Sequence, residues 1–255
     1  MPLDFTDKIV QITGAGSGFG RTAAQKFSKA GSKLVLSDIN EAGLAETVSL
    51  LDLPAGRLMT LPCDVSDPDQ VAHMVTRAVE TFGALDIAIN NAGMANEMAR
   101  IGEASLSEFD QVMAVNVRGV FLCMQHELQQ MSRQGHGVIL NVASVAGLIG
   151  APYMGIYAAS KHAVIGLTKA AALEYARKNI RINAICPAFC YTPMVGQIID
   201  GKGGDKREAD MANNIPMGRL GTAEEIVHGM MWLCSAENSF TTGQALAFDG
   251  GLTTA

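Results

Sequence analysis

Residues 8–29, KIVQITGAGSGFGRTAAQKFSK, decide the fold that the sequence predicts. The apolar run at 9–12 predicts a buried strand, and 21–29 predicts a helix. Between them, the loop 14–20 holds four glycines, which permit a tight turn and a close approach of the backbone to a ligand. The free N–H groups and the dipole of a helix N-terminus favour a bound diphosphate. Strand, glycine loop and helix together predict the phosphate-binding unit of an α/β fold.

The same alternation of strand and helix continues along the chain. Further apolar runs predict strands at 34–37, 58–61, 85–89, 138–142, 180–185 and 245–248. Helical segments are predicted between them, among them 66–80, 105–132, 160–177 and 223–233. Because no break in composition marks a linker, we predict one doubly wound, Rossmann-type α/β domain over 1–255. Its seven-stranded parallel sheet is flanked by helices.

Three helix N-termini have candidate caps. Ser66 is the expected N-cap of the helix that runs through residue 80. Ser105 with Glu108 and Thr222 with Glu225 have the spacing of capping boxes.

Composition excludes several classes of protein. Of the 255 residues, 48% are hydrophobic and 17% are charged, which is typical of a globular protein. The net charge of −6 argues against nucleic acid or an anionic membrane as the main partner. No apolar stretch is long enough to span a membrane, and residues 1–8, MPLDFTDK, lack the apolar core of a signal peptide. We therefore expect a cytoplasmic protein.

The cysteines and histidines do not suggest a metal site. The five cysteines include no CxxC pair, and the five histidines show neither HxH nor HExxH spacing. Four of the cysteines lie in or beside apolar segments. We interpret them as small buried hydrophobic residues in a reducing compartment.

Ser144, Tyr157 and Lys161 are the candidate catalytic residues. Ser144 follows the strand 138–142, and Lys161 lies four residues after Tyr157, on the same face of a helix. A free phenol has a pKa of about 10, so a tyrosine base near neutrality needs roughly 4 kcal/mol of help. One cation about 4 Å away supplies that amount at an effective dielectric near 20. We therefore expect Lys161 to lower the pKa of Tyr157, although such pairs also occur on solvated helix faces.

Asp38 bears on the choice of cofactor. It ends the strand 34–37, eighteen residues after Gly20. An acid at this place accepts hydrogen bonds from the adenosine ribose and repels a 2′-phosphate. Because neither Ser17 nor Ile39 is basic, the prediction is NAD(H) rather than NADP(H). The alternative is that Asp38 only caps the next turn.

Other polar residues follow the predicted strands. Asp64 comes just after the strand 58–61, and residues 90–93, NNAG, follow the strand 85–89, at the sheet edge where such folds bind ligands. Asn116 lies inside a predicted helix, where asparagine is unfavourable, which indicates a bend or a polar task. The segment 190–217 is polar and rich in glycine between 197 and 214, and we interpret it as a substrate lid.

Jointly these motifs resemble the short-chain dehydrogenase/reductase family over essentially the full length. The matching residues are Thr13, Gly14, Gly18, Gly20, Asn90, Asn91, Ala92, Gly93, Asn116, Ser144, Tyr157, Lys161, Pro187, Thr192, Asp249, Gly250 and Gly251. Ala188 departs from the pattern, because the family usually has Pro-Gly where this chain has Pro187-Ala188. Gln11, in the first strand, has no explanation at this level.

The resemblance implies a division of labour. Tyr157 would be the general base for alcohol oxidation or the acid for ketone reduction. Lys161 would bind the nicotinamide ribose and lower the pKa of Tyr157. Ser144 would donate a hydrogen bond to the substrate oxygen, and Asn116 would hold a water that relays protons. Hydride would pass between the substrate carbon and the nicotinamide. The implied cofactor contacts are Gly14, Ser17, Gly18, Phe19, Gly20, Asp38, Asp64, Val65, Asn91, Ala92, Gly93, Tyr157, Lys161, Pro187, Cys190 and Thr192.

The resemblance also implies a homotetramer paired through the helices 105–132 and 160–177. The substrate itself is less defined. The candidate pocket residues are mostly apolar, so a hydrophobic or cyclic secondary alcohol is favoured. These residues are Ser144, Val145, Met154, Tyr157, Phe189 and Met194. Polyols, sugars, steroids and 3-oxoacyl thioesters remain alternatives.

Two rival functions fit the sequence less well. Enoyl reductases of related architecture place their tyrosine and lysine seven residues apart, whereas the spacing here is four. A dinucleotide-binding scaffold or sensor would be expected to have lost Ser144, Tyr157 or Lys161, and all three are present. The prediction is therefore an NAD-dependent alcohol dehydrogenase or ketoreductase.

Overall fold

The computed structural model describes residues 3–193, 195–196 and 204–254. Within them, seven parallel strands form one sheet in the order β3-β2-β1-β4-β5-β6-β7. The strand order reverses between β1 and β4, which is where doubly wound sheets bind ligands. The predicted fold class is confirmed. The strands are β1 (Ile9–Thr13), β2 (Lys33–Asp38), β3 (Leu58–Pro62), β4 (Ile87–Asn90), β5 (Gly137–Val142), β6 (Ile180–Pro187) and β7 (Ala245–Phe248).

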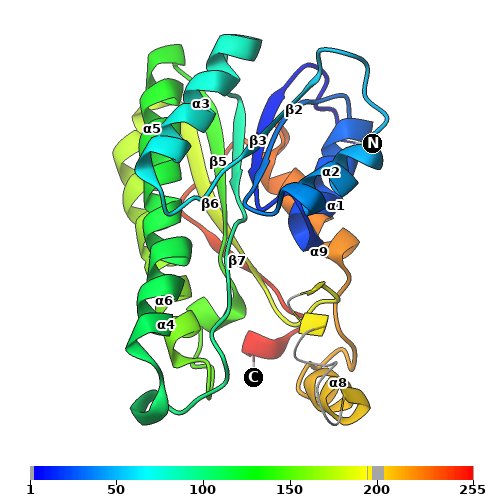
Figure 1. The fold of residues 1–255 in the computed structure, drawn as a ribbon, viewed down its shortest axis with the longest axis vertical. Helices are drawn as coiled ribbons and strands as arrows, with labels where there is room; N and C mark the ends of the chain where they lie inside the picture. The colour runs from blue at the N-terminus through cyan, green and yellow to red at the C-terminus, as the bar shows by residue number, and fades with distance from the viewer. Residues whose placement is uncertain (1–2, 194, 197–203, 255) are drawn as a thin grey trace.

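Helices cover both faces of the sheet, as Figure 1 shows. On one face lie α3 (Pro68–Phe82), α5 (Val120–Gln134) and α6 (Gly155–Tyr175). On the other face lie α1 (Gly18–Lys29), α2 (Glu41–Ser49) and α9 (Ala223–Cys234). The two hydrophobic cores lie between the sheet and these layers. The central strands are buried on both sides, which explains why they are continuous apolar runs and not alternating ones.

The predicted long helix at 105–132 consists of three joined pieces. These are α4 (Leu106–Met113), the π-helical segment η2 (Ala114–Gly119) and α5. Asn116 lies in η2 and is completely buried. Short π-helical segments inside α-helices occur often at functional sites.

The predicted caps have different outcomes. The capping box of Thr222 and Glu225 is confirmed, with both of its hydrogen bonds formed. The predicted cap at Ser66 is wrong: Asp67 caps α3, accepting from the N–H of residues 69 and 70. The box at Ser105 is also wrong, because Glu108 accepts the N–H of residue 97 instead.

Part of the predicted lid is helical. Residues 204–213 form α8 (Gly204–Asn213), although the glycines upstream suggested irregular structure. Acidic, basic and alanine side chains between 205 and 212 favour a helix once the glycine run has ended. Residues 197–203 and the candidate pocket residue Met194 lie outside the described residues.

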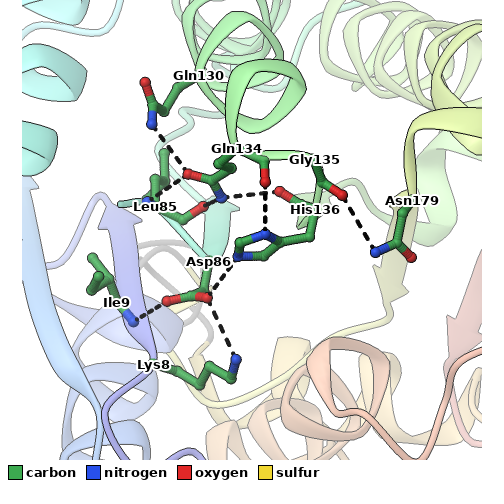
Figure 2. A network of polar contacts seen from close by, with 9 residues as sticks. All are labelled: Lys8, Ile9, Leu85, Asp86, Gln130, Gln134, Gly135, His136 and Asn179. Carbon is green, nitrogen blue, oxygen red and sulfur yellow. Dashed lines mark hydrogen bonds and ion pairs between the residues drawn. The ribbon is translucent and has the colours of Figure 1, made fainter. Parts of the chain in front are cut away.

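A polar network holds the amino ends of the central strands (Figure 2). Asp86, just before β4, accepts the N–H of Ile9 at 2.9 Å and lies 3.2 Å from Nε2 of His136. Gln134, at the end of α5, bonds to both the N–H and the carbonyl of Leu85. These bonds fix the register of strands β1, β4 and β5 at the edge away from the glycine loop.

The polar Gln11 in the largely apolar first strand is bonded to a buried carboxylate. It is completely buried in β1, and its Nε2 donates to Oε1 of Glu127 in α5 at 2.9 Å. The other carboxylate oxygen accepts from Asn90 at 3.0 Å. From Asn90 the chain of bonds continues through Asn141 to Thr168 in α6. A buried polar ladder therefore ties both α5 and α6 to the middle of the sheet.

The cysteines, the helix lengths and the possible metal ligands are further features of the structure. All five cysteines are buried as free thiols, as expected. Among the described helices, none is long and apolar enough to cross a membrane. No group of three or more potential metal ligands is found among the described residues.

Candidate active site

The glycine loop is fixed to the end of β4. Asn91 Nδ2 donates to the carbonyls of Thr13 and Gly14 at 2.9 and 3.0 Å. In return, the Thr13 hydroxyl oxygen accepts the N–H groups of Asn91 and Ala92 at 3.0 Å. Gly14 has φ +65°, and a methyl group there would lie 2.9 Å from Cα of Ala92. The structure therefore brings these predicted cofactor residues together. The close approach of the backbone at residue 14 to that of Ala92 requires a glycine at position 14.

Asp38 faces the same loop. Its Oδ2 accepts the N–H of Gly16 at 2.7 Å, and its Oδ1 accepts the N–H of Asn40 at 2.8 Å. The alternative role of Asp38 as a turn cap is thus real, and it coexists with a place beside the glycine loop. Arg21, which the sequence analysis missed, donates to the Gly16 carbonyl and pairs with Glu46 at 2.7 Å. In the sequence, the feature that could have pointed to Arg21 is its position directly after Gly20, the last glycine of the loop.

The residues after β6 approach the loop from the other side. Thr192 side-chain atoms lie 3.8–3.9 Å from where a side chain on Gly18 would begin, and Gly18 has φ +51°. Pro187 is the last residue of β6 and is buried. Cys190 is 2% exposed, and its thiol packs against Gly221. Thr192 therefore lies beside the glycine loop, whereas the Cys190 thiol is buried.

Asp64 and Val65, two of the implied cofactor contacts, make contacts within the protein. The Asp64 carboxylate accepts both the N–H and the hydroxyl of Ser66, at 2.8 and 2.7 Å. Val65 packs against Gly119, where a methyl group would come within 2.7 Å of it. Ser17 is the N-cap residue of α1, and Phe19 packs on the core beneath the loop.

Ser144, Tyr157 and Lys161 meet at the carboxyl edge of the sheet. The Tyr157 phenol is hydrogen-bonded to the Ser144 side chain. Lys161 Nζ lies 5.5 Å from the centre of the Tyr157 ring and donates to the carbonyl of Val142 at 2.8 Å. Ser144 follows β5 in extended conformation, and Lys161 lies one helical turn beyond Tyr157 in α6. Strand end and helix therefore deliver the three groups to one place.

The acid–base balance differs from the expectation. Burial raises the pKa of Tyr157, and the hydrogen bond from Ser144 works against this rise. Burial also lowers the pKa of Lys161 to about 8. The predicted lowering of the Tyr157 pKa by Lys161 is therefore not what the structure gives. Desolvation dominates both groups, and the ammonium is aimed at a backbone carbonyl.

Asn116 joins this cluster through its side chain. Its Nδ2 donates to the Met94 carbonyl at 2.8 Å and to the Ser160 hydroxyl at 3.0 Å, while its Oδ1 accepts the N–H of Met94 at 2.8 Å. A methyl group on Gly93 would lie 3.2 Å from Asn116 Oδ1 and 3.5 Å from Lys161 Nζ. The water-holding role implied for Asn116 stays a prediction.

The candidate pocket residues surround the same edge. Val145 is buried directly after Ser144, whereas Met154 and Phe189 are partly exposed. Met154 precedes α6 and pairs through its backbone with Ala99. The neighbouring segment supplies a residue that the sequence analysis missed, Asn96, which accepts the N–H of Tyr157 at 3.0 Å.

These features fit a dinucleotide. Two loop glycines have positive φ, helix α1 begins within the loop, and a side chain on Gly93 would begin 3.5 Å from Lys161 Nζ. The residues that would hold the group are those of the glycine loop together with Asp38, Asn91 and Lys161.

Comparisons with known proteins agree with this geometry. A family model described as enoyl-(acyl carrier protein) reductase matches residues 14–253. A cyclohexanol dehydrogenase from Acinetobacter sp. is 39% identical, over 99% of this chain and 98% of that protein. The crystal structure of a levodione reductase superposes with a TM-score of 0.95 at 38% identity, covering 98% of this chain and 99% of that one.

Similar solved structures include complexes with a nicotinamide cofactor. A 3-ketoacyl-(acyl-carrier-protein) reductase from Brucella melitensis, complexed with NADH, has a TM-score of 0.90 at 33% identity. ElxO with NADP bound has a TM-score of 0.92 at 33% identity. Each comparison covers 98% of this chain and 100% of the other.

Proposed function

The chain belongs to the short-chain dehydrogenase/reductase family, and from that premise we propose that it interconverts a cyclic secondary alcohol and its ketone with NAD(H). The observation that carries this proposal is the cluster of Tyr157, hydrogen-bonded to Ser144, with Lys161 one turn further along α6. Cyclohexanol dehydrogenase and cis-4-hydroxycyclohexanecarboxylate dehydrogenase are named for ring substrates, and both match nearly the full chain. The apolar Val145 and the partly exposed Met154 and Phe189 support a ring-shaped substrate.

In the proposed mechanism the protein handles the proton. When bound, the nicotinamide accepts or supplies the hydride. Tyr157 takes the hydroxyl proton during oxidation and returns it during reduction. Ser144 donates a hydrogen bond to the substrate oxygen and stabilises the charge that develops on it. Lys161 would hold the ribose hydroxyls of the bound cofactor, one helical turn from Tyr157. Asn116 orders the surrounding backbone and a proton-relaying water.

The proposed preference for NAD over NADP depends on Asp38. Its carboxylate lies against Gly16, where a 2′-phosphate would meet negative charge. Arg21, a cation that contacts the same loop, is already engaged by Glu46 and Gly16. Asp38→Ala is expected to raise kcat/KM for NADP by about ten-fold or more relative to NAD, because a repulsion of roughly 1.4 kcal/mol is removed. A wild-type enzyme that already prefers NADP would contradict the assignment.

A second candidate is the reduction of 3-oxoacyl thioesters. It is supported by a 3-oxoacyl-[acyl-carrier-protein] reductase from Thermotoga maritima that is 36% identical over 96% of this chain. Enoyl reduction has less support despite the wording of the family model, because Tyr157 and Lys161 are four residues apart and not seven.

Assembly, lid and compartment are further parts of the proposal. A homotetramer through α4, α5 and α6 is supported by exposed apolar side chains on those helices: Leu106, Phe121 and Leu173. A substrate lid at 190–217 is supported by the hydrogen bond from Tyr191 to Glu208, which ties the segment after β6 to α8. The five buried free thiols support a reducing compartment, the cytoplasm.

The test is a steady-state assay of NADH formation with cyclohexanol, linear secondary alcohols and polyols. In the reverse direction, cyclic ketones are compared with a 3-oxoacyl thioester. We expect the cyclic substrates to have the highest kcat/KM. Turnover confined to the thioester would support the second candidate, and no turnover of any alcohol or ketone would contradict the proposed function.

A further inference from the structure

The N-terminal turn of α6 receives its cap from a distant part of the chain. Met154, at the N-cap position, makes no capping bond with its side chain. Tyr157 is the third residue of the helix, so its N–H has no partner within the helix. Oδ1 of Asn96 accepts that N–H at 3.0 Å, across 61 residues of sequence. Asn96 is 7% exposed, so this bond is largely shielded from water.

Asn96 belongs to a segment, residues 94–101, that crosses the start of α6; we call it the 94–101 strap. At its first residue, Met94 is held by Asn116 through two hydrogen bonds of 2.8 Å. Further along, the N–H of Ala99 donates to the Tyr153 carbonyl at 3.0 Å. Ile101 packs on Gly155, where a methyl group would come within 2.9 Å of it. The strap is therefore fixed at several points to the first turn of the helix.

The backbone that the strap grips is strained. Tyr153 has φ +64°, a left-handed backbone conformation that residues other than glycine and asparagine rarely adopt. Strain of this kind persists only where the surroundings impose it. The Tyr153 carbonyl accepts the N–H of Ala99 and also Nδ2 of Asn96 at 3.4 Å. The amide nitrogen of Asn96 also donates to the carbonyl of Glu97 within the strap, at 2.7 Å. Asn96 thus reaches both sides of the helix start: its amide oxygen accepts the N–H of Tyr157, and its amide nitrogen donates to the Tyr153 carbonyl.

We propose that Asn96 is a positioning residue for proton transfer, which acts through Tyr157 by fixing the turn that aims the phenol at Ser144. The inference rests on the proposed function of Tyr157. The N–H that Asn96 holds belongs to the same residue as the phenol, so a shift of that turn moves the hydroxyl directly. Displacements of about 1 Å in a reacting group lower rates by up to 10²-fold.

The test compares four variants with wild type: Asn96→Ala, Asn96→Asp, Asn238→Ala and Tyr157→Phe. Asn96→Asp keeps the acceptor oxygen and removes the donor. Asn238 is a matched control, because it is also buried, at 4% exposed, and its Nδ2 donates to the Leu233 carbonyl near the end of α9, outside the strap and α6. The measurements are kcat and KM for cyclohexanol, the fluorescence-detected affinity for NADH, the melting temperature and the pH dependence of kcat.

We expect Asn96→Ala to lower kcat by about 10- to 100-fold, with the NADH affinity unchanged. Asn96→Asp should stay within about five-fold of wild type. Asn238→Ala should have a lower melting temperature than wild type and an unchanged kcat. Because the Ser144 hydrogen bond lowers the pKa of Tyr157, loss of alignment should also move the rising limb of kcat for oxidation to higher pH, in Asn96→Ala only.

Three results would overturn the inference: wild-type kcat in Asn96→Ala, an equal loss in Asn96→Asp, or the same pH shift in Asn238→Ala. If Asn96→Ala does not fold, the Asn96 variants are made in a Tyr153→Gly background and compared with Tyr153→Gly alone. Glycine adopts the positive φ at position 153 without strain. The Tyr157→Phe arm separates the two failures. Full turnover in Tyr157→Phe contradicts the proposed function, whereas an inactive Tyr157→Phe beside a fully active Asn96→Ala contradicts only the positioning role.

Discussion

Lys161 and Glu127 are two buried ionisable residues in neighbouring helices on the same side of the sheet. Lys161 is 4% exposed and Glu127 is completely buried. Burial lowers the pKa of Lys161 to about 8 and raises that of Glu127 to about 7. Uncharged groups hold both: the Val142 carbonyl for the lysine, and the amides of Gln11 and Asn90 for the glutamate.

The two environments differ in what lies next to the charge. Lys161 is at the open carboxyl edge, 5.5 Å from the ring of Tyr157 and beside Gly93. Glu127 is hydrogen-bonded to Gln11 in the middle of β1 and to Asn90 at the end of β4, two amides that cannot react. A shifted pKa therefore does not by itself mark a catalytic residue. The neighbours decide whether a buried charge serves chemistry or architecture, and the following changes test that division.

The largest expected effect is on the lysine side. Lys161→Met keeps the length of the side chain and removes the ammonium that would hold the nicotinamide ribose beside Tyr157, so kcat should fall by about 10²-fold or more. Stability should hold or rise, because a buried charge is removed. Steady-state kinetics and thermal melting check both parts. A variant that melts early and keeps its kcat would reverse the roles assigned to the two residues.

On the glutamate side, the expected effect is on stability. Glu127→Ala leaves Gln11 Nε2 without an acceptor and opens a cavity, and should lower the free energy of unfolding by about 2–4 kcal/mol. The control is Glu127→Gln, whose amide can donate to the buried oxygens of Gln11 and Asn90, which lack partners in the structure. Urea unfolding measures the difference. For both Glu127 variants, kcat of the folded protein should equal that of wild type. A large loss of kcat in Glu127→Gln would show that Glu127 takes part in catalysis.

The two charges should also respond to pH in opposite directions. The pKa of Glu127 is raised from 4.5 to about 7, so its contribution to stability is present below pH 4.5 and is lost as the pH rises to about 7. The pKa of Lys161 is lowered from 10.5 to about 8, so its contribution is present above pH 10.5 and is lost as the pH falls to about 8. Each change amounts to about 3 kcal/mol.

Unfolding free energies measured across these pH ranges, as wild type minus Glu127→Gln and wild type minus Lys161→Met, check the signs. The first difference should fall with rising pH, and the second should rise. A flat profile for either residue would mean that its charge is solvated in the folded protein.

The smallest effect is expected for Gln11→Met, which removes one donor to Glu127 and fills the same space. The loss of a single hydrogen bond to a charged group should lower the free energy of unfolding by about 1.5–3 kcal/mol at pH 8. At pH 5, where Glu127 is protonated, the loss should be smaller. An equal loss at both values would show that packing, and not the carboxylate, explains Gln11.

The sequence predicted the sheet well because its strands are buried on both faces and stand out as apolar runs. Positions 144, 157 and 161 could be paired because strand ends and helical spacing are local features. The contact between Asn96 and Tyr157 could not be predicted, since 61 residues separate them and an asparagine in an irregular segment carries no periodic signal. The direction of the Tyr157 pKa shift also depended on burial, which spacing alone does not give.

The central claim is that the Tyr157 phenol exchanges the proton with the substrate oxygen. The most direct measurement is the rate of NADH formation from saturating cyclohexanol and NAD in Tyr157→Phe, with the NADH affinity determined on the same protein. The expected result is a fall in rate of about 10²- to 10⁴-fold with unchanged affinity for NADH. A rate equal to that of wild type would contradict the account.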